Sequence, residues 1–77
     1  IKMIDIDVLL KTQLDVGDEP EHISNPYTGE TILLTPEEVA VHDLVKGAES
    51  LRDYETVAAG CDWFRENNSK AYMVLLD

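Results

Sequence analysis

The sequence predicts a mainly α-helical domain that carries a small β-hairpin. Residues 35–51 combine helix-starting residues with an apolar stripe, and a second striped segment follows after a short turn. Residues 22–34 contain turn residues flanked by apolar ones. We therefore expect one small domain spanning all 77 residues. In it, residues 1–34 form an extended arm with the hairpin. Residues 35–77 form the core, an antiparallel helical pair closed by a short C-terminal helix.

The first 16 residues fit two patterns. A strand pattern, interrupted by Leu9, is formed by Ile4, Ile6, Val8 and Leu10, which alternate with polar residues. A helical pattern is formed by Met3, Ile6, Leu10 and Leu14, which recur at spacings of three and four. Because β-branched residues favour strands, we expect this segment to be extended.

Residues 17–21, GDEPE, interrupt both patterns and predict a mobile surface loop. The acids in and beside this loop are Asp15, Asp18, Glu19 and Glu21. They lack the alternating positions and distal glutamate of a helix-loop-helix calcium site, so we expect no metal there.

The next segment, residues 22–34, predicts a tight hairpin. Asn25 and Pro26 open a turn, and Gly29 can adopt the positive φ of a bulge. Ile23 and Ile32 flank the turn symmetrically.

The helix predicted over residues 35–51 has the clearest signals in the chain. Thr35 and Glu38 have the spacing of a capping box, and Pro36 suits the first helical position. Its apolar stripe consists of Val41, Leu44, Val45, Ala48 and Leu51.

A second helix is predicted over residues 54–67, with Asp53 as its cap. Its stripe consists of Val57, Cys61 and Phe64. Small residues on the two helices predict close backbone approach: Gly47 and Ala48 on the first, and Ala58, Ala59 and Gly60 on the second. Residues 70–77 predict a short last helix with Tyr72, Leu75 and Leu76 turned inward.

Sixteen acidic residues against six basic ones give a formal net charge of −10. Residues 12–45 contain eight acids and neither Lys nor Arg. This sign excludes binding to nucleic acids through their phosphates and to anionic membranes. It suits either a solvated surface or an acidic patch that meets a basic protein.

No pattern in the sequence predicts a catalytic site, a cofactor site or a metal site. His42 is expected at the surface or its boundary, and Cys61 is expected to act as a small core residue. The single cysteine cannot form an internal disulfide, so the chain is either cytosolic or indifferent to redox state. Since the sequence also has no membrane-length apolar run, we expect a cytoplasmic protein.

Trp63 lies off the stripe of its helix, as Val39 does on the first helix. We expect Trp63 either to pack on the N-terminal hairpin or to anchor a partner protein, since Trp is enriched at interfaces. The candidate partner surface comprises Trp63, Val39, Asp15, Asp18, Glu19 and Glu21. If the arm covers the two apolar residues, the chain is a monomer; if it does not, a homodimer is the alternative.

Two resemblances cover part of the chain. The motif NPYTGE, the helix TPEEVAVHDLVKGAE, the DWF element and the ending AYMVLLD resemble small proteins of tailed bacteriophages, especially of marine cyanobacterial phages. This resemblance implies a phage origin and attaches no activity. Asp53-Tyr54-Glu55, Trp63-Phe64, Asn67-Asn68 and Ala71-Tyr72 are similar to part of a tetratricopeptide repeat. The helix is about one turn short for this repeat, and a single unit lacks the stacked neighbours that such arrays need.

These observations predict a non-enzymatic, acidic protein-interaction module, namely a phage accessory protein that acts in the host cytoplasm. The alternative is an acidic nucleic-acid mimic that binds a host nucleic-acid-binding protein. An unidentified protein partner is expected in both cases.

Overall fold

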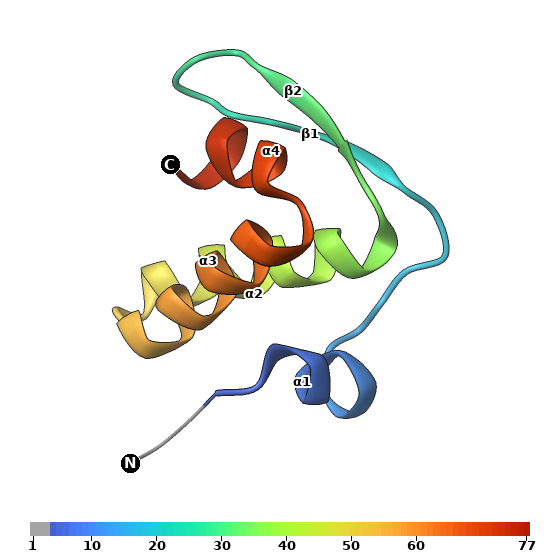
Figure 1. Ribbon diagram of the computed structural model, residues 1–77, viewed down its shortest axis with the longest axis vertical. Helices are drawn as coiled ribbons and strands as arrows, with labels where there is room; N and C mark the ends of the chain where they lie inside the picture. Colours follow the sequence, from blue (N-terminus) through green and yellow to red (C-terminus); the bar gives the residue numbers. More distant parts are fainter. Residues whose placement is uncertain (1–3) are drawn as a thin grey trace.

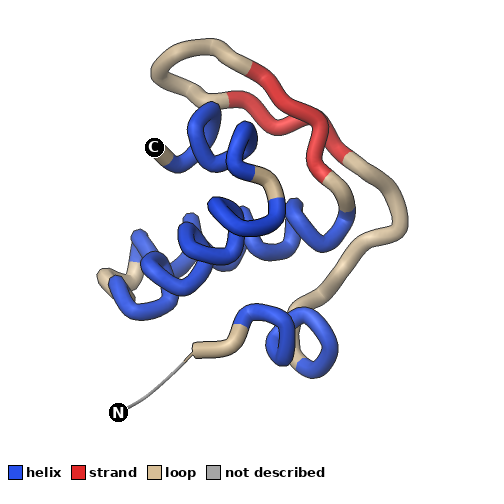
Figure 2. The backbone as a smooth tube through the Cα atoms, viewed as in Figure 1, coloured by secondary structure: helices blue, strands red, loops and turns tan. Residues whose placement is uncertain are grey.

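The computed structural model describes residues 4–77 and has the predicted mainly α-helical fold with one small hairpin (Figure 1). The elements are α1 (Ile6–Thr12), β1 (Glu21–Ser24), β2 (Thr31–Leu34), α2 (Pro36–Ser50), α3 (Tyr54–Asn67), α4 (Ser69–Ala71) and the π-helix η1 (Tyr72–Leu76). Helices α2 and α3 lie side by side as an antiparallel pair. Helix α1 packs on one side of this pair, and η1 packs against α3 on the side of the hairpin (Figure 2).

The predicted extended structure of residues 1–16 is wrong, because residues 6–12 form the helix α1. Residues 1–3 of that prediction lie outside the described residues. Asp5 caps the helix by accepting a hydrogen bond from the Val8 backbone N–H at 3.2 Å. The helix buries Ile6 and leaves Val8 51% exposed, whereas a strand would place both on one face. Burial against α2 and α3 has therefore outweighed the local β preference.

Helix α2 begins with the predicted capping box. The Thr35 hydroxyl accepts from the Glu38 N–H at 3.3 Å, and Glu38 Oε1 accepts from the Thr35 N–H at 2.9 Å. The second carboxylate oxygen of Glu38 accepts from Asn68 Nδ2 at 2.9 Å. Asn68 in turn caps α4 through the Ala71 N–H. One buried carboxylate therefore links the start of α2 to the junction between α3 and α4.

The connection between α2 and α3 reverses the chain within three residues, 51–53. The N–H groups of Arg52 and Asp53 donate to the carbonyls of Glu49 and Ala48, as in a Schellman motif. Arg52 has a φ of 58°, a conformation that favours glycine. Asp53 then caps α3 as predicted, accepting from the Thr56 N–H and hydroxyl.

Gly60 of α3 packs directly against α2 in the seam between the two helices. A Cβ atom on Gly60 would lie 2.2 Å from Val45 Cγ2, so any other residue here would require this fully buried valine or its helix to shift. The prediction of close approach is wrong for Gly47, which is exposed: a Cβ atom added there would have no neighbour within 4 Å. The buried cluster around the seam consists of Ile6, Leu34, Val41, Val45, Phe64, Ala71 and Leu75.

The hairpin forms with the predicted symmetry, and Ile23 pairs with Ile32. Gly29 has a φ of 76°, as the turn requires. Asn25 Oδ1 accepts from the Tyr27 N–H at 2.8 Å, which closes an Asx turn. Its Nδ2 donates to the Val74 carbonyl at 2.9 Å. The hairpin is thereby tied to the C-terminal helix, over which it arches in Figure 1.

The C-terminal segment is helical as predicted, but it changes from an α-helix to a π-helix after Ala71. The Asp77 N–H donates to the Tyr72 carbonyl at 2.8 Å, a separation of five residues. Leu75 is buried, and Tyr72 and Leu76 are half-buried, so the predicted inward face is confirmed.

The two helical glycines of the pair are expected to respond to alanine in opposite ways. Gly60→Ala should lower the free energy of unfolding by about 1–2 kcal/mol, because overpacking at Val45 exceeds the gain in helix propensity. Gly47→Ala should raise it by about 0.5–1 kcal/mol, because the same gain meets no steric cost. Urea denaturation of both variants measures the effects. Equal responses at the two sites would show that Gly60 does not set the helix separation.

Candidate functional site

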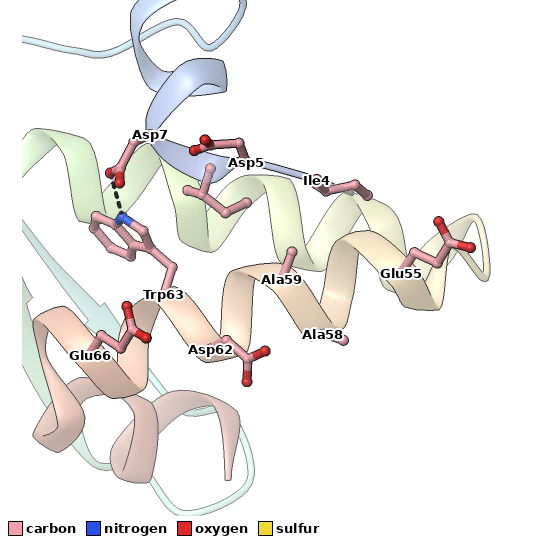
Figure 3. A pocket seen from close by; sticks show the side chains of 10 residues that line it. Ile4, Asp5, Asp7, Glu55, Ala58, Ala59, Asp62, Trp63 and Glu66 are labelled. Carbon is pink, nitrogen blue, oxygen red and sulfur yellow. Dashed lines mark hydrogen bonds between the residues drawn. The ribbon is translucent and has the colours of Figure 1, made fainter. Parts of the chain in front are cut away.

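A groove of about 700 Å³ lies between the N-terminal end of α1 and one side of α3 (Figure 3). Its apolar lining consists of Ile4, Ile6, Ala58, Ala59 and Trp63. Its polar lining consists of five acids: Asp5, Asp7, Glu55, Asp62 and Glu66. The groove therefore combines an apolar floor with a negatively charged rim, and among residues 4–77 neither Lys nor Arg lines it.

Trp63 is held from two sides. Its indole N–H donates to Asp7 Oδ1 at 3.1 Å, as the dashed line in Figure 3 marks. Its ring meets the fully buried Phe64 ring edge to face, with centroids 5.2 Å apart and an interplanar angle of 88°. The half-buried indole therefore has a fixed orientation in the groove.

The sequence predicted two alternative settings for Trp63, against the hairpin or at an exposed interface. The first prediction named the wrong neighbour, because residues 4–7, rather than the hairpin, line the groove beside the Trp63 ring. The error follows from that of α1: an extended arm was expected to bring the hairpin here, whereas a short helix occupies the position.

The rim acids of α3 lie along one side of the helix. Glu55, Asp62 and Glu66 are separated by seven and four residues, which places them on the same face. Asp62 forms an ion pair with Arg65, whose guanidinium also stacks on the Tyr72 ring at 4.9 Å. Within residues 4–77, Glu55 and Glu66 have no basic partner at ion-pair distance. Both are exposed and face solvent.

Val39 and most of the predicted acidic residues lie in a different hollow, of about 190 Å³. The loop between α1 and β1 contributes Asp15 and Glu19 to it, the first residue of β1 contributes Glu21, and α2 contributes Val39. Asp18 is exposed in the same loop but does not line the hollow. The structure therefore divides the predicted partner surface into two parts, with Trp63 in one and Val39 in the other.

The groove residues other than Trp63 were missed from the sequence. The stripe formed by Glu55, Asp62 and Glu66 beside Trp63 is a signal that could have identified the α3 side. Asp5 and Asp7 gave no such signal, because their position depends on α1 being helical.

Apart from the acidic side chains of the groove, residues 4–77 provide few groups suited to metal binding or nucleophilic attack. No group of three or more His, Cys, Asp or Glu side chains among residues 4–77 is placed to hold a metal ion. Burial raises the pKa of the Cys61 thiol, with nearby Arg65 acting in the opposite direction. This thiol therefore stays protonated at neutral pH, which suits packing better than nucleophilic attack.

In the described part of the chain, His42 Nδ1 is the one buried side-chain nitrogen or oxygen without a hydrogen-bond partner. Its side chain is 12% exposed, and Nδ1 makes no hydrogen bond. The exposed Asp43 carboxylate lies 3.7 Å from Nδ1, beyond hydrogen-bond distance. Burial lowers the pKa of His42, and the charge of Lys46 lowers it further, while Asp43 opposes both.

We expect His42 to make the protein less stable as the pH falls. A folded-state pKa below 6.5 means that the unfolded chain binds the proton more readily. The free energy of unfolding should therefore decrease from about pH 6.5 downward, until the folded-state pKa has been passed. Urea midpoints measured across this range should show a smaller pH dependence for His42→Gln than for the parent.

His22→Gln is the control, because His22 is exposed on β1. This variant should retain the pH dependence of the parent. Identical pH profiles for His42→Gln and the parent would show that protonation of His42 is not coupled to unfolding.

Comparisons with known proteins provide no functional assignment for the groove. No protein-family model, curated protein or solved structure matches this chain. Among residues 4–77, no helix is both long enough and apolar enough to cross a bilayer. The groove between α1 and α3 is therefore the feature on which a functional proposal rests.

Proposed function

We propose that this chain is a non-enzymatic protein-interaction module that binds a positively charged protein. The observation that carries the proposal is the groove between α1 and α3, which joins an apolar floor to five acids. Protein interfaces combine these features: an apolar centre supplies much of the affinity, and a charged rim selects the partner. The net charge of −10 adds long-range attraction for a basic partner.

The biological setting is part of the same proposal. The resemblance of the motif NPYTGE and the ending AYMVLLD to small tailed-phage proteins supports a phage accessory protein. Such a protein would act on a host protein in the cytoplasm of the infected cell.

The chain would act as a monomer. Trp63 and Val39 are half-buried rather than exposed, which reduces the apolar surface that these two residues offer for self-association. The net charge also opposes the approach of a second copy at low salt.

A nucleic-acid mimic is the second candidate function. The observation that favours it is the stretch of residues 12–45, with eight acids and neither Lys nor Arg. Four of its acids, Asp15, Asp18, Glu19 and Glu21, are all exposed. In this function the chain would occupy the phosphate-binding surface of a host nucleic-acid-binding protein.

Capture from a cyanobacterial host lysate tests the proposal. The immobilised chain should enrich basic proteins over a bead-bound acidic protein of similar net charge. Raising the salt from about 0.1 M to about 1 M shortens the Debye length from about 10 Å to about 3 Å. A groove-bound partner should persist through this change because apolar contacts contribute to its binding.

The outcomes separate the two candidates. Salt-sensitive capture of nucleic-acid-binding proteins, displaced by added DNA, would support the mimic instead. Enrichment no greater than that on the acidic control protein would contradict both.

A further inference from the structure

We infer that the groove between α1 and α3 binds a basic amphipathic helix of the partner, laid along α3. This inference rests on the proposed function and deepens it by naming the site and the chemical class of the ligand. The apolar floor and the acidic rim of the groove together fit such a helix.

The floor of the groove supplies an apolar anchor, Trp63, and space for the backbone of a ligand helix. Trp63 is oriented by Asp7 and braced by Phe64, so little side-chain entropy remains to be lost when a ligand packs against it. Ala58 and Ala59 have short side chains, which allow a second helix to approach α3 closely. Leucine-type side chains from a partner would cover the indole and Ile4.

The rim supplies the charge complementarity. Glu55 and Glu66 are eleven residues apart on α3, which corresponds to about 16 Å or three helical turns. Lys or Arg residues spaced by three and four on a partner helix would meet these acids in succession. Glu55 and Glu66 have no basic partner among the described residues, so pairing them breaks no internal ion pair.

Other occupants fit the same surface poorly. In a two-fold symmetric dimer, a second copy of the chain would bring the same acids against this rim. Phosphate backbones and anionic membranes carry the charge that the rim repels. A small apolar ligand would fill the floor but provide no basic group for the exposed carboxylates of Glu55 and Glu66.

The test uses a synthetic amphipathic peptide with the 14-residue length of α3, with Leu on one face and Lys on its flanks. One control peptide replaces Lys with Glu, and another scrambles the order so that the net charge is kept and the amphipathic face is lost. Isothermal titration calorimetry should detect binding of the first peptide alone. In a ¹H–¹⁵N correlation spectrum, the indole N–H of Trp63 and the amides of Ala58 and Ala59 should shift.

Two variants with the same change in net charge locate the site. Glu55→Gln combined with Glu66→Gln should weaken peptide binding by about fivefold, because two exposed ion pairs are lost. The matched variant, Asp18→Asn combined with Glu19→Gln in the exposed loop, should weaken it by less than about twofold. Ala58→Gln fills the floor at an exposed helical position without changing charge, and it should also weaken binding several-fold. All variants are first checked for the dispersed spectrum of the folded parent.

The outcomes distinguish this inference from the proposed function. Equal weakening by the groove and loop variants would mean attraction by net charge alone and would overturn the groove. Greater weakening by the loop variant would also overturn it, and would move the site to the hollow at Val39. Equal binding of the scrambled peptide would overturn the helical ligand. No binding by either cationic peptide would overturn the inference, while capture of a basic protein from lysate would still support the proposed function.

Discussion

The packing of α2 against α3 is the constraint on which the other contacts of this small protein depend. Gly60 lies directly against Val45 in this seam, where a single added carbon would clash with the buried valine. Other elements pack on two sides of the α2–α3 pair. On one side α1 packs on it and contacts Trp63, and on the other the C-terminal helix packs against α3. A shift at the seam would therefore move the floor of the groove relative to α1. In a chain with so small a core, one glycine supports both the fold and the candidate site.

Polar side chains, rather than further apolar burial, tie the ends of the elements together. Glu38 is buried, yet both of its carboxylate oxygens accept hydrogen bonds, one within its own capping box and one from Asn68. Asn25 similarly closes its own turn and donates to the Val74 carbonyl, which lies near the end of the C-terminal helix. Each side chain satisfies backbone or amide groups that would otherwise be costly to bury. The result is that the hairpin, α2 and the C-terminal helix share a few specific contacts that fix their relative positions.

The elements that were predicted correctly are those whose signals lie within a few residues. The caps at Thr35 and Asp53 define where α2 and α3 begin, and the turn residues around Gly29 define the hairpin. The helix α1 was missed because its residues fit two periodicities, and burial of Ile6 against distant elements decided between them. The π-helical geometry of Tyr72–Leu76 has no local signal that we recognise. The groove required α1, so only its α3 side, with Trp63, was accessible to sequence reasoning.

The hydrogen bond between Trp63 and Asp7 joins residues 56 positions apart, and Trp63 is the only tryptophan of the chain. The intrinsic fluorescence of the protein therefore reports chiefly on one contact, the docking of α1 on α3. Far-UV circular dichroism, by contrast, reports on all the helices together. In a thermal melt, coincident transitions would mean that α1 is part of the cooperative unit. An earlier fluorescence transition would mean that α1 detaches while the α2–α3 pair remains folded. The chain thus contains an optical probe placed at the boundary between its core and its N-terminal helix.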